Sequence, residues 1–105
     1  MTSTEVIEQI GELLGKAAPP NSRVVLFGSH ARGTADADSD YDVLVIEPTV
    51  EDVIQESVRL RSKLDDLEVP IDVIVMDKAK ADQRAGERGT MVERALREGR
   101  LLAQT

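Results

Sequence analysis

Three aspartates stand at the start of two apolar segments, where their side chains could act together. Asp40 and Asp42 open the segment "DYDVLV", and Asp72 has a similar early place in "IDVIV". Because side chains alternate along a strand, Asp40 and Asp42 are expected on one face, roughly 7 Å apart. If the two segments are neighbouring strands, the three carboxylates converge on one patch. Ionised carboxylates held this close raise one another's pKa unless a cation compensates their charge.

This acidic pattern favours a divalent cation as the missing positive charge. Mg²⁺ is a hard cation that prefers oxygen ligands, which the carboxylates of Asp40, Asp42 and Asp72 would supply. Two such ions about 3.5–4 Å apart are the usual arrangement for in-line displacement at phosphorus. The pattern therefore predicts magnesium-dependent chemistry on a phosphate ester.

A Gly-Ser pair follows another apolar segment and is typical of a phosphate-binding turn. Gly28 permits close approach of the backbone, and Ser29 can open a short helix whose free N–H groups attract phosphate. Arg32, one turn later, can offer a planar guanidinium fork to phosphate oxygens. A surface ion pair with Asp36 or Asp38 is an equally good interpretation of this arginine.

Other polar residues near the aspartates have simpler interpretations. Asp38 precedes the strand, so an outer or solvated position is expected, and Ser39 either contacts phosphate or serves the loop alone. His30 is the only histidine, and a structural or solvent-facing role is favoured over that of a general base. Tyr41 alternates away from the aspartates and is expected to pack into the core on the opposite face.

The elements that must position these residues alternate between helix and strand. Strands are expected over 23–27, 41–47 and 71–77, where short apolar runs are bounded by turn residues. A helix should begin at the capping box of Thr2 and Glu5 and end before Pro19. This alternation predicts an α/β fold, a sheet packed with helices, in one domain over 1–105.

The second half of the chain is expected to hold two further helices. One should open at Pro48 and Thr49, run as a long amphipathic helix and stop before Pro70. The polar segment 78–89, which contains two glycines, is expected to be a loop. Thr90 should cap a last helix that Gly99 ends.

Composition excludes several other classes of protein. The 105 residues have 41% apolar side chains with one Phe, one Tyr and no Trp, so aliphatic residues must build the core. A net charge of −7 argues against direct nucleic-acid binding. The absence of cysteine excludes disulfides and thiolate metal sites and agrees with the cytoplasm, and no signal peptide or membrane span is expected.

The segment "GSHARGTADADSDYDVLV", together with Asp72, resembles the nucleotidyltransferase superfamily that includes DNA polymerase beta and the kanamycin nucleotidyltransferases. The pattern of that superfamily is Gly-Ser, ten residues, Asp-x-Asp, and a third Asp on a later strand. Gly28 and Ser29 are followed by ten residues and then by Asp40 and Asp42. The resemblance to the short form, the minimal nucleotidyltransferases (MNT), covers nearly the whole chain and implies a small mixed sheet with three core strands.

This resemblance also implies roles for individual residues. Asp40 and Asp42 would bind both of two Mg²⁺ ions, and Asp72 would bind one ion and help to deprotonate the attacking hydroxyl. Ser29 and Arg32 would bind the triphosphate of ATP, and Gly28 and Ser39 are the other candidate nucleotide-binding residues. The catalytic residues implied are therefore the three aspartates.

The acceptor of the nucleotide is expected on another protein. Larger relatives carry an acceptor-binding domain, whereas only about 33 residues follow Asp72 here. MNT proteins pair as antitoxins with HEPN RNase toxins, which implies transfer of AMP from ATP to a toxin tyrosine. A catalytically silent antitoxin that acts by binding and a small-molecule transferase of the aminoglycoside type are the alternatives. Leu101 and Leu102 could dock a partner or pack on their own core.

Overall fold

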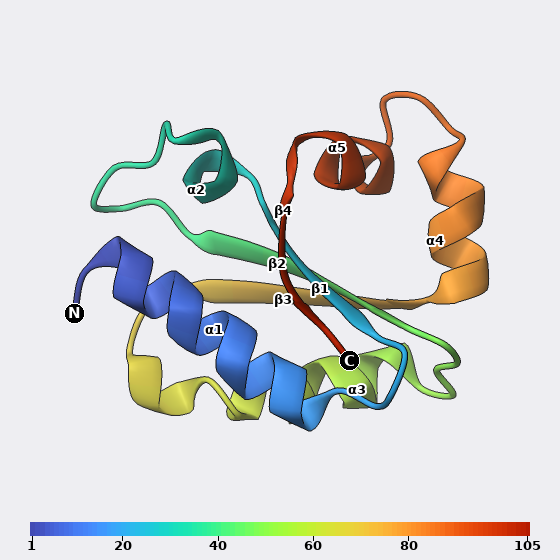
Figure 1. Ribbon diagram of the computed structural model, residues 1–105, viewed down its shortest axis with the longest axis horizontal. Helices are drawn as coiled ribbons and strands as arrows, with labels where there is room; N and C mark the ends of the chain where they lie inside the picture. The colour runs from blue at the N-terminus through green and yellow to red at the C-terminus, as the bar shows by residue number, and fades with distance from the viewer.

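A mixed four-stranded sheet forms the centre of the molecule (Figure 1). The structure is a computed structural model that describes residues 1–105. The strand order is β3-β2-β1-β4. β2 pairs in parallel with β3, and β1 pairs antiparallel with both β2 and β4. The strands are β1 (Arg23–Phe27), β2 (Tyr41–Glu47), β3 (Ile71–Asp77) and β4 (Arg100–Gln104).

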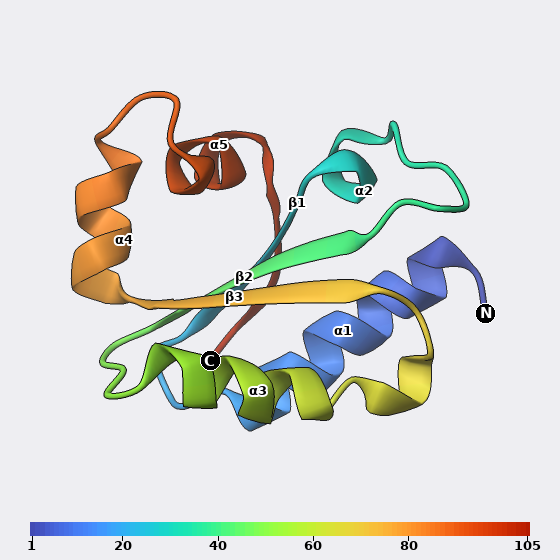
Figure 2. The same cartoon turned by 180° about the vertical axis from the view of Figure 1, so that it is seen from behind.

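Helices cover both faces of this sheet, as the two opposite views show (Figures 1 and 2). α1 and α3 pack on one face, and α4 and α5 pack on the other. A four-residue helix, α2, lies between β1 and β2. The helices are α1 (Ser3–Ala17), α2 (Ser29–Arg32), α3 (Val53–Ser62), the 3₁₀ turn η1 (Asp65–Leu67), α4 (Lys78–Ala85) and α5 (Met91–Glu98).

The apolar residues of β2 explain why the sheet is covered on both sides. Val43 and Val45 belong to the core under α1 and α3, whereas Leu44 and Ile46 belong to the core under α4 and α5. A strand buried on both faces is a near-continuous apolar run, unlike the alternating strand of a half-exposed sheet. β2 is therefore the fixed central strand on which the candidate site is built.

Several sequence expectations are confirmed. The α/β fold and the three strands at 23–27, 41–47 and 71–77 are as predicted. Thr2 and Glu5 form the expected capping box, and the Thr90 side chain accepts a hydrogen bond from the Glu93 N–H at 3.2 Å at the start of α5. α5 ends at Gly99, also as expected.

The expected mixed sheet with three core strands is confirmed, and β4, which was not predicted, adds a fourth strand at its edge. "RLLAQ" has no alternation of apolar and polar residues, so its hydropathy does not predict a strand. Backbone pairing along β1 defines it instead, and Gly11 of α1 lets Leu102 approach closely. Leu102 packs on the core under α1, while the side chain of Leu101 is half exposed.

The boundaries of the middle helices also differ from the expectation. α3 begins later than Pro48, because the Asp52 side chain accepts a hydrogen bond from the Gln55 N–H and caps the helix there. It ends at Ser62 and is followed by the separate turn η1, so one long helix to Pro70 was wrong. Ile54 and Val58, two apolar residues of this helix, are exposed.

The segment expected to be a loop over 78–89 begins with a helix. The Asp77 side chain accepts a hydrogen bond from the Lys80 N–H at 2.8 Å and so caps the start of α4. Lys78 forms an ion pair with Asp82 one turn later, which also stabilises the helix. Ala81 is the buried residue of this helix and packs in the core under α4 and α5. None of the helices combines the length and the apolar character that crossing a membrane requires.

Candidate active site

Asp42 and Asp72 lie side by side on neighbouring strands. The register of the parallel pair β2–β3 sets Asp42 directly opposite Asp72. Residues paired in this way point to the same face of the sheet. Asp40 precedes β2 by one residue and, like Asp72, is exposed, whereas Asp42 is partly buried. The expected juxtaposition of the two strands is therefore confirmed, and with it the nearness of Asp42 and Asp72.

The carboxylates affect one another electrostatically. Burial raises the pKa of Asp42, and the negative charges of Asp72 and Asp40 raise it further. His30 and Arg32 act in the opposite direction but do not cancel the rise. The energy of ionising Asp42 therefore contains a repulsion that a bound cation would remove.

The carboxylates of Asp40, Asp42 and Asp72 are ligands of the type that a hard divalent cation binds. Carboxylate oxygens are the ligands that Mg²⁺ prefers, and two of the three carboxylates, Asp42 and Asp72, stand on paired residues of β2 and β3. No three His, Cys, Asp or Glu side chains already stand together as a metal-ligating group. Side-chain rotation of the exposed Asp40 and Asp72 would be needed to complete one.

Gly28 joins the end of β1 to these carboxylates. Phe27, the last residue of β1, pairs with Asp42, and Gly28 follows with φ of 75°. A Cβ atom at Gly28 would collide with the Asp42 carboxylate. Glycine is needed here both for the left-handed backbone and for the close approach. The turn then enters α2, where the Gly28 carbonyl accepts hydrogen bonds from the Ala31 and Arg32 N–H groups.

A pocket of about 320 Å³ lies between this turn and α5. Gly28, Ser29, Arg32 and Asp42 all border it, so the structure brings together four of the residues predicted from the sequence. Arg32 pairs with Glu98 of α5 at 3.9 Å, not with Asp36 or Asp38. The full lining is Phe27, Gly28, Ser29, Arg32, Asp42, Met91, Arg94, Ala95 and Glu98.

Sequence reasoning missed the contribution of α5 to this pocket. Arg94 and Glu98 lie four residues apart, and Met91 and Ala95 share their helix face. That spacing was visible in the sequence, but nothing in it says that this face turns toward Gly28. Only the packing of α5 on the sheet reveals the connection.

Ser39 lies outside the lining of the pocket and serves its own loop. Its hydroxyl donates to the Asp36 carboxylate at 3.2 Å and accepts the Asp36 N–H at 3.0 Å. Asp38 is exposed in the same loop, and its N–H also donates to the Asp36 carboxylate. A contact between Ser39 and phosphate stays a prediction.

His30 and Tyr41 have structural positions. Their rings stack with centroids 3.7 Å apart, and Nε2 of His30 lies 3.2 Å from the Ser39 carbonyl oxygen. The buried Tyr41 ring belongs to the core under α1, and its hydroxyl meets the Ser3 hydroxyl at 3.1 Å. The structural interpretation of His30 and the core position of Tyr41 are both confirmed.

Asp72 borders a second, separate hollow. This groove, of about 540 Å³, runs between α3 and the start of β3. Asp42 borders the pocket beside α5, and Asp72, on the edge strand β3, also borders the groove beside α3. The lining consists of Ser57, Val58, Arg61, Ser62, Asp65, Ile71, Asp72 and Val73.

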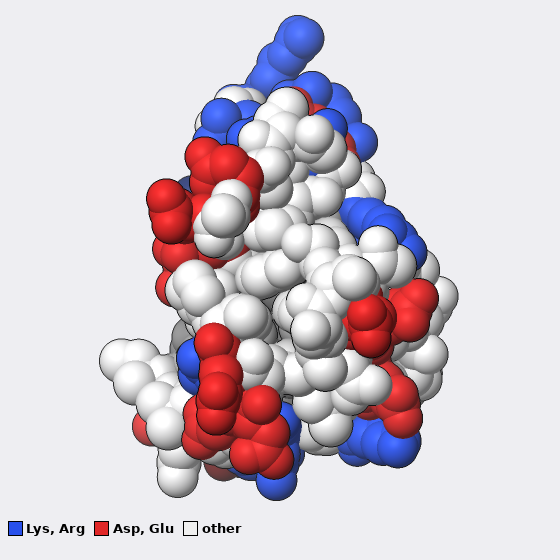
Figure 3. All heavy atoms as spheres, turned by 90° about the vertical axis from the view of Figure 1, so that its left-hand side faces the viewer, with Lys and Arg blue, Asp and Glu red and all other residues white.

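Acidic side chains gather in several places on the surface. The side that carries the start of α1 and the α2–β2 loop shows several separate acidic patches with white surface between them (Figure 3). A further acidic group surrounds a hollow of about 430 Å³ at the far end of β2, around Glu47 and Glu56. This last hollow is distant from Asp42 along the strand, so its acids need a separate explanation.

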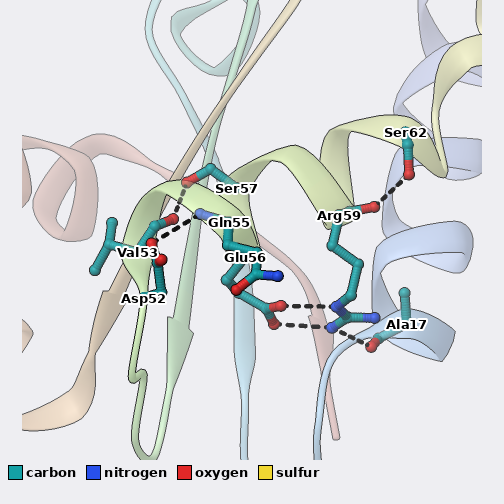
Figure 4. A network of polar contacts seen from close by, with 8 residues as sticks. All are labelled: Ala17, Asp52, Val53, Gln55, Glu56, Ser57, Arg59 and Ser62. Atoms are coloured by element: carbon teal, nitrogen blue, oxygen red, sulfur yellow. Dashed lines mark hydrogen bonds and ion pairs between the residues drawn. The ribbon is translucent and has the colours of Figure 1, made fainter.

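Arg59 supplies the positive charge for this distant acidic group (Figure 4). Its guanidinium donates to both oxygens of Glu56, at 2.7 and 2.8 Å, and to the Ala17 carbonyl at 2.9 Å. Glu47 is 3% exposed, and burial together with the neighbouring Glu56 raises the pKa of Glu47 to about 8. The carboxyl of Glu47 is therefore mostly protonated at neutral pH, and this group is balanced within the protein.

Comparison with known proteins identifies the family. The sequence model of the nucleotidyltransferase domain matches residues 5–102. No curated protein sequence matches the chain. The match covers nearly all the described elements, including the Gly28–Ser29 turn and the three aspartates.

Solved structures share the fold. A chain from the crystal structure of a toxin–antitoxin with AMP-PNP is 24% identical, with a TM-score of 0.66 over 94% of this chain and 73% of that chain. A putative nucleotidyltransferase from Sulfolobus solfataricus is 22% identical, with a TM-score of 0.60 over 92% and 76%. A tri-AMPylated Shewanella oneidensis HEPN toxin in complex with MNT antitoxin contains a chain 20% identical, with a TM-score of 0.63 over 99% and 74%. The protein belongs to the nucleotidyltransferase domain family.

Proposed function

We propose that this chain is a Mg²⁺-dependent protein adenylyltransferase, acting over 1–105 as one unit in the cytoplasm. It would transfer AMP from ATP to a tyrosine hydroxyl of a HEPN-type RNase toxin and so act as an antitoxin. The observation that carries the proposal is the pairing of Asp42 with Asp72, beside a pocket that Gly28, Ser29 and Arg32 border.

The pocket next to Asp42 is the side for the nucleotide. Ser29 and Arg32 would bind the triphosphate through hydroxyl, backbone N–H and guanidinium donors. Asp40, Asp42 and Asp72 would hold two Mg²⁺ ions, which neutralise phosphate charge and favour attack at phosphorus. Without a cation, the same carboxylates would repel the triphosphate.

The exposed edge of the sheet at Asp72, on strand β3, is the side for the acceptor. There the tyrosine oxygen would attack the α-phosphorus of ATP, and its proton would pass to the Asp72 carboxylate. A new bond forms between the tyrosine oxygen and phosphorus while the bond from phosphorus to the bridging oxygen breaks. Pyrophosphate leaves on the side of Ser29 and Arg32, opposite the attacking oxygen, as in-line displacement requires.

Similar structures support a protein acceptor. One is a toxin–antitoxin with AMP-PNP, and another contains a tri-AMPylated HEPN toxin with MNT antitoxin. Asp72 and its groove are exposed, so a bulky partner could present a side chain there. Positioning of the hydroxyl is a major part of phosphoryl-transfer catalysis, and a docked protein supplies it better than a freely diffusing alcohol.

Intact-mass spectrometry tests the proposal. The chain is incubated with a HEPN-type protein, ATP and Mg²⁺, and the partner should gain the mass of one or more adenylyl groups and lose its RNase activity. Asp72→Asn in place of the wild type should leave the partner unmodified. A partner that stays unmodified but is silenced in a stable complex would favour the binding-only antitoxin. Adenylylation of an aminoglycoside in place of the partner would favour a small-molecule transferase.

A further inference from the structure

One face of α5 forms the wall of the Gly28–Ser29 pocket opposite α2. Met91, Arg94, Ala95 and Glu98 all line this pocket, at the spacing of residues on one side of a helix. Two of the four side chains are charged, with opposite signs. The nucleotide pocket of the proposed function therefore contains an arginine and a glutamate that the family pattern does not include.

Arg94 has no counter-ion. It makes no ion pair and no side-chain hydrogen bond, whereas Arg97, on the same helix, pairs with Glu93 at 2.9 Å and with Glu98 at 3.3 Å. The protein has a net charge of −7, so acids to pair with are abundant. An unpaired guanidinium in this pocket, beside Ser29 and Arg32, is free to bind an anionic ligand.

Glu98 binds the other arginine of the pocket. Its Oε2 lies 3.9 Å from Nη1 of Arg32, and both side chains are substantially exposed, at 36% and 49%. An ion pair of this length and exposure is weak. A triphosphate, with several charged oxygens, can replace the single carboxylate as the partner of Arg32.

Close packing fixes α5 relative to the turn that follows β1. Gly99, at the end of α5, lies so near β1 that a Cβ atom would stand 2.7 Å from Val25 Cγ1 and 2.8 Å from the Leu26 carbonyl oxygen. β1 continues directly into Gly28 and Ser29. Both walls of the pocket are therefore attached to the same strand, which holds Arg94 at a set position relative to Ser29.

We infer that Arg94 is a triphosphate-binding residue and that Glu98 stays paired with Arg32 until the nucleotide displaces the Glu98 carboxylate. This inference rests on the proposed function and adds to it a second arginine on the α5 side of the pocket. Arg32 and Arg94 bind the triphosphate from opposite walls. Glu98 lowers nucleotide affinity, because its bond to Arg32 must break and its charge repels phosphate.

Calorimetric titration of AMP-PNP in the presence of Mg²⁺ tests both roles. Arg94→Gln should weaken binding about tenfold or more, as expected for loss of a charged contact to phosphate. Glu98→Gln should tighten binding roughly threefold, the scale of an exposed ion pair. Arg88→Gln is the matched control, since Arg88 is also exposed and unpaired but does not line the pocket. It should leave affinity unchanged.

A second titration with AMP shows which part of the nucleotide Arg94 contacts. Arg94→Gln should have a much smaller effect on AMP, which lacks the terminal phosphates. Equal losses for both ligands, or an Arg94→Gln affinity equal to that of Arg88→Gln, would overturn the inference while the proposed function stands. Failure of the wild type to bind AMP-PNP would instead remove the proposed function and this inference together.

Discussion

The two ends of strand β2 both carry acidic groups, but their charges are balanced in different ways. At its C-terminal end, Glu47 is buried, and Nε and Nη2 of Arg59 donate hydrogen bonds to the Glu56 carboxylate. At its N-terminal end, Asp42 is partly buried beside Asp72, and the nearest basic groups do not offset the rise in its pKa. One strand therefore holds an acidic group that the protein neutralises itself and another that it does not.

This difference separates structure from function among acidic residues. The Glu47 hollow is larger than the Asp42 pocket, yet its acids are explained by burial, which raises the pKa of Glu47, and by an arginine that joins α3 to the end of α1. The aspartates have no such internal partner. A carboxylate whose pKa is raised by burial and by neighbouring carboxylates, without an internal cation to offset the rise, indicates that the cation comes with a ligand.

The largest expected effect is the loss of transfer on neutralising an aspartate. Asp42→Asn or Asp72→Asn should reduce adenylyl transfer by at least about a thousandfold, because metal ligation is lost. Thermal melts should show an intact fold, equal or slightly higher in stability, since each change relieves repulsion. Asp38→Asn, in the exposed loop, is the control and should keep activity. Transfer by both of the first two variants would refute their catalytic role, and collapsed melts would make these acids structural.

Glu47 should make stability depend on pH. Its folded pKa, about 8, lies above the ordinary value of 4.5, so the folded protein binds the proton more tightly than the unfolded chain. The free energy of unfolding must then fall as pH rises from 4.5 to about 8 and level off above it. Glu56 acts on the other side, because Arg59 lowers its pKa and stability is lost as pH falls below the ordinary value.

Glu47→Gln isolates this pH dependence. Relative to the wild type, the unfolding free energy of the variant should rise by on the order of 4 kcal/mol between pH 4.5 and about 8. Urea denaturation at a series of pH values measures the difference. Glu51→Gln, an exposed acid of the same hollow, should run parallel to the wild type. A Glu47→Gln curve that is also parallel would show that Glu47 ionises normally in the folded state.

A smaller effect is expected at Arg59. Arg59→Gln leaves the partly buried Glu56 without its cation and removes the hydrogen bond to the Ala17 carbonyl. Stability should fall by about 1–2 kcal/mol at neutral pH. Lys16→Gln breaks the fully exposed pair with Glu12 and should cost less than about 0.5 kcal/mol, also by denaturation. Equal effects would mean that Arg59 is only another surface charge.

Much of the fold follows from local patterns in the sequence. Some elements are determined by neighbouring residues and were therefore predictable. They are the helices capped by Thr2 and Thr90 and the apolar strands β1, β2 and β3. β4 was not, because its formation depends on pairing with β1 and not on its own residues. α4 was missed because its polar residues have one buried position, Ala81, and its cap, Asp77, also ends a strand.

The candidate site divides in the same way. Gly28, Ser29 and Asp42 were predicted from the spacing of the family pattern and Asp72 from its place in a later strand, and the β2–β3 register brings the two aspartates together. Arg94 could not be found, since its place in the pocket depends on the long-range packing of α5 against β1. Residues of a local motif can be predicted from the sequence, whereas contacts between distant elements can be identified only in the folded chain.

The cation dependence of nucleotide binding tests the central claim most directly. AMP-PNP is titrated calorimetrically into the wild type and into Asp42→Asn, each in Mg²⁺ and in EDTA. The wild type should bind at least about tenfold more tightly in Mg²⁺, because the cation neutralises carboxylates that otherwise repel phosphate. Asp42→Asn should lose most of this difference. Equal wild-type affinity in Mg²⁺ and EDTA would contradict the claim that the aspartates at the start of β2 and β3 form a cation-dependent nucleotide site.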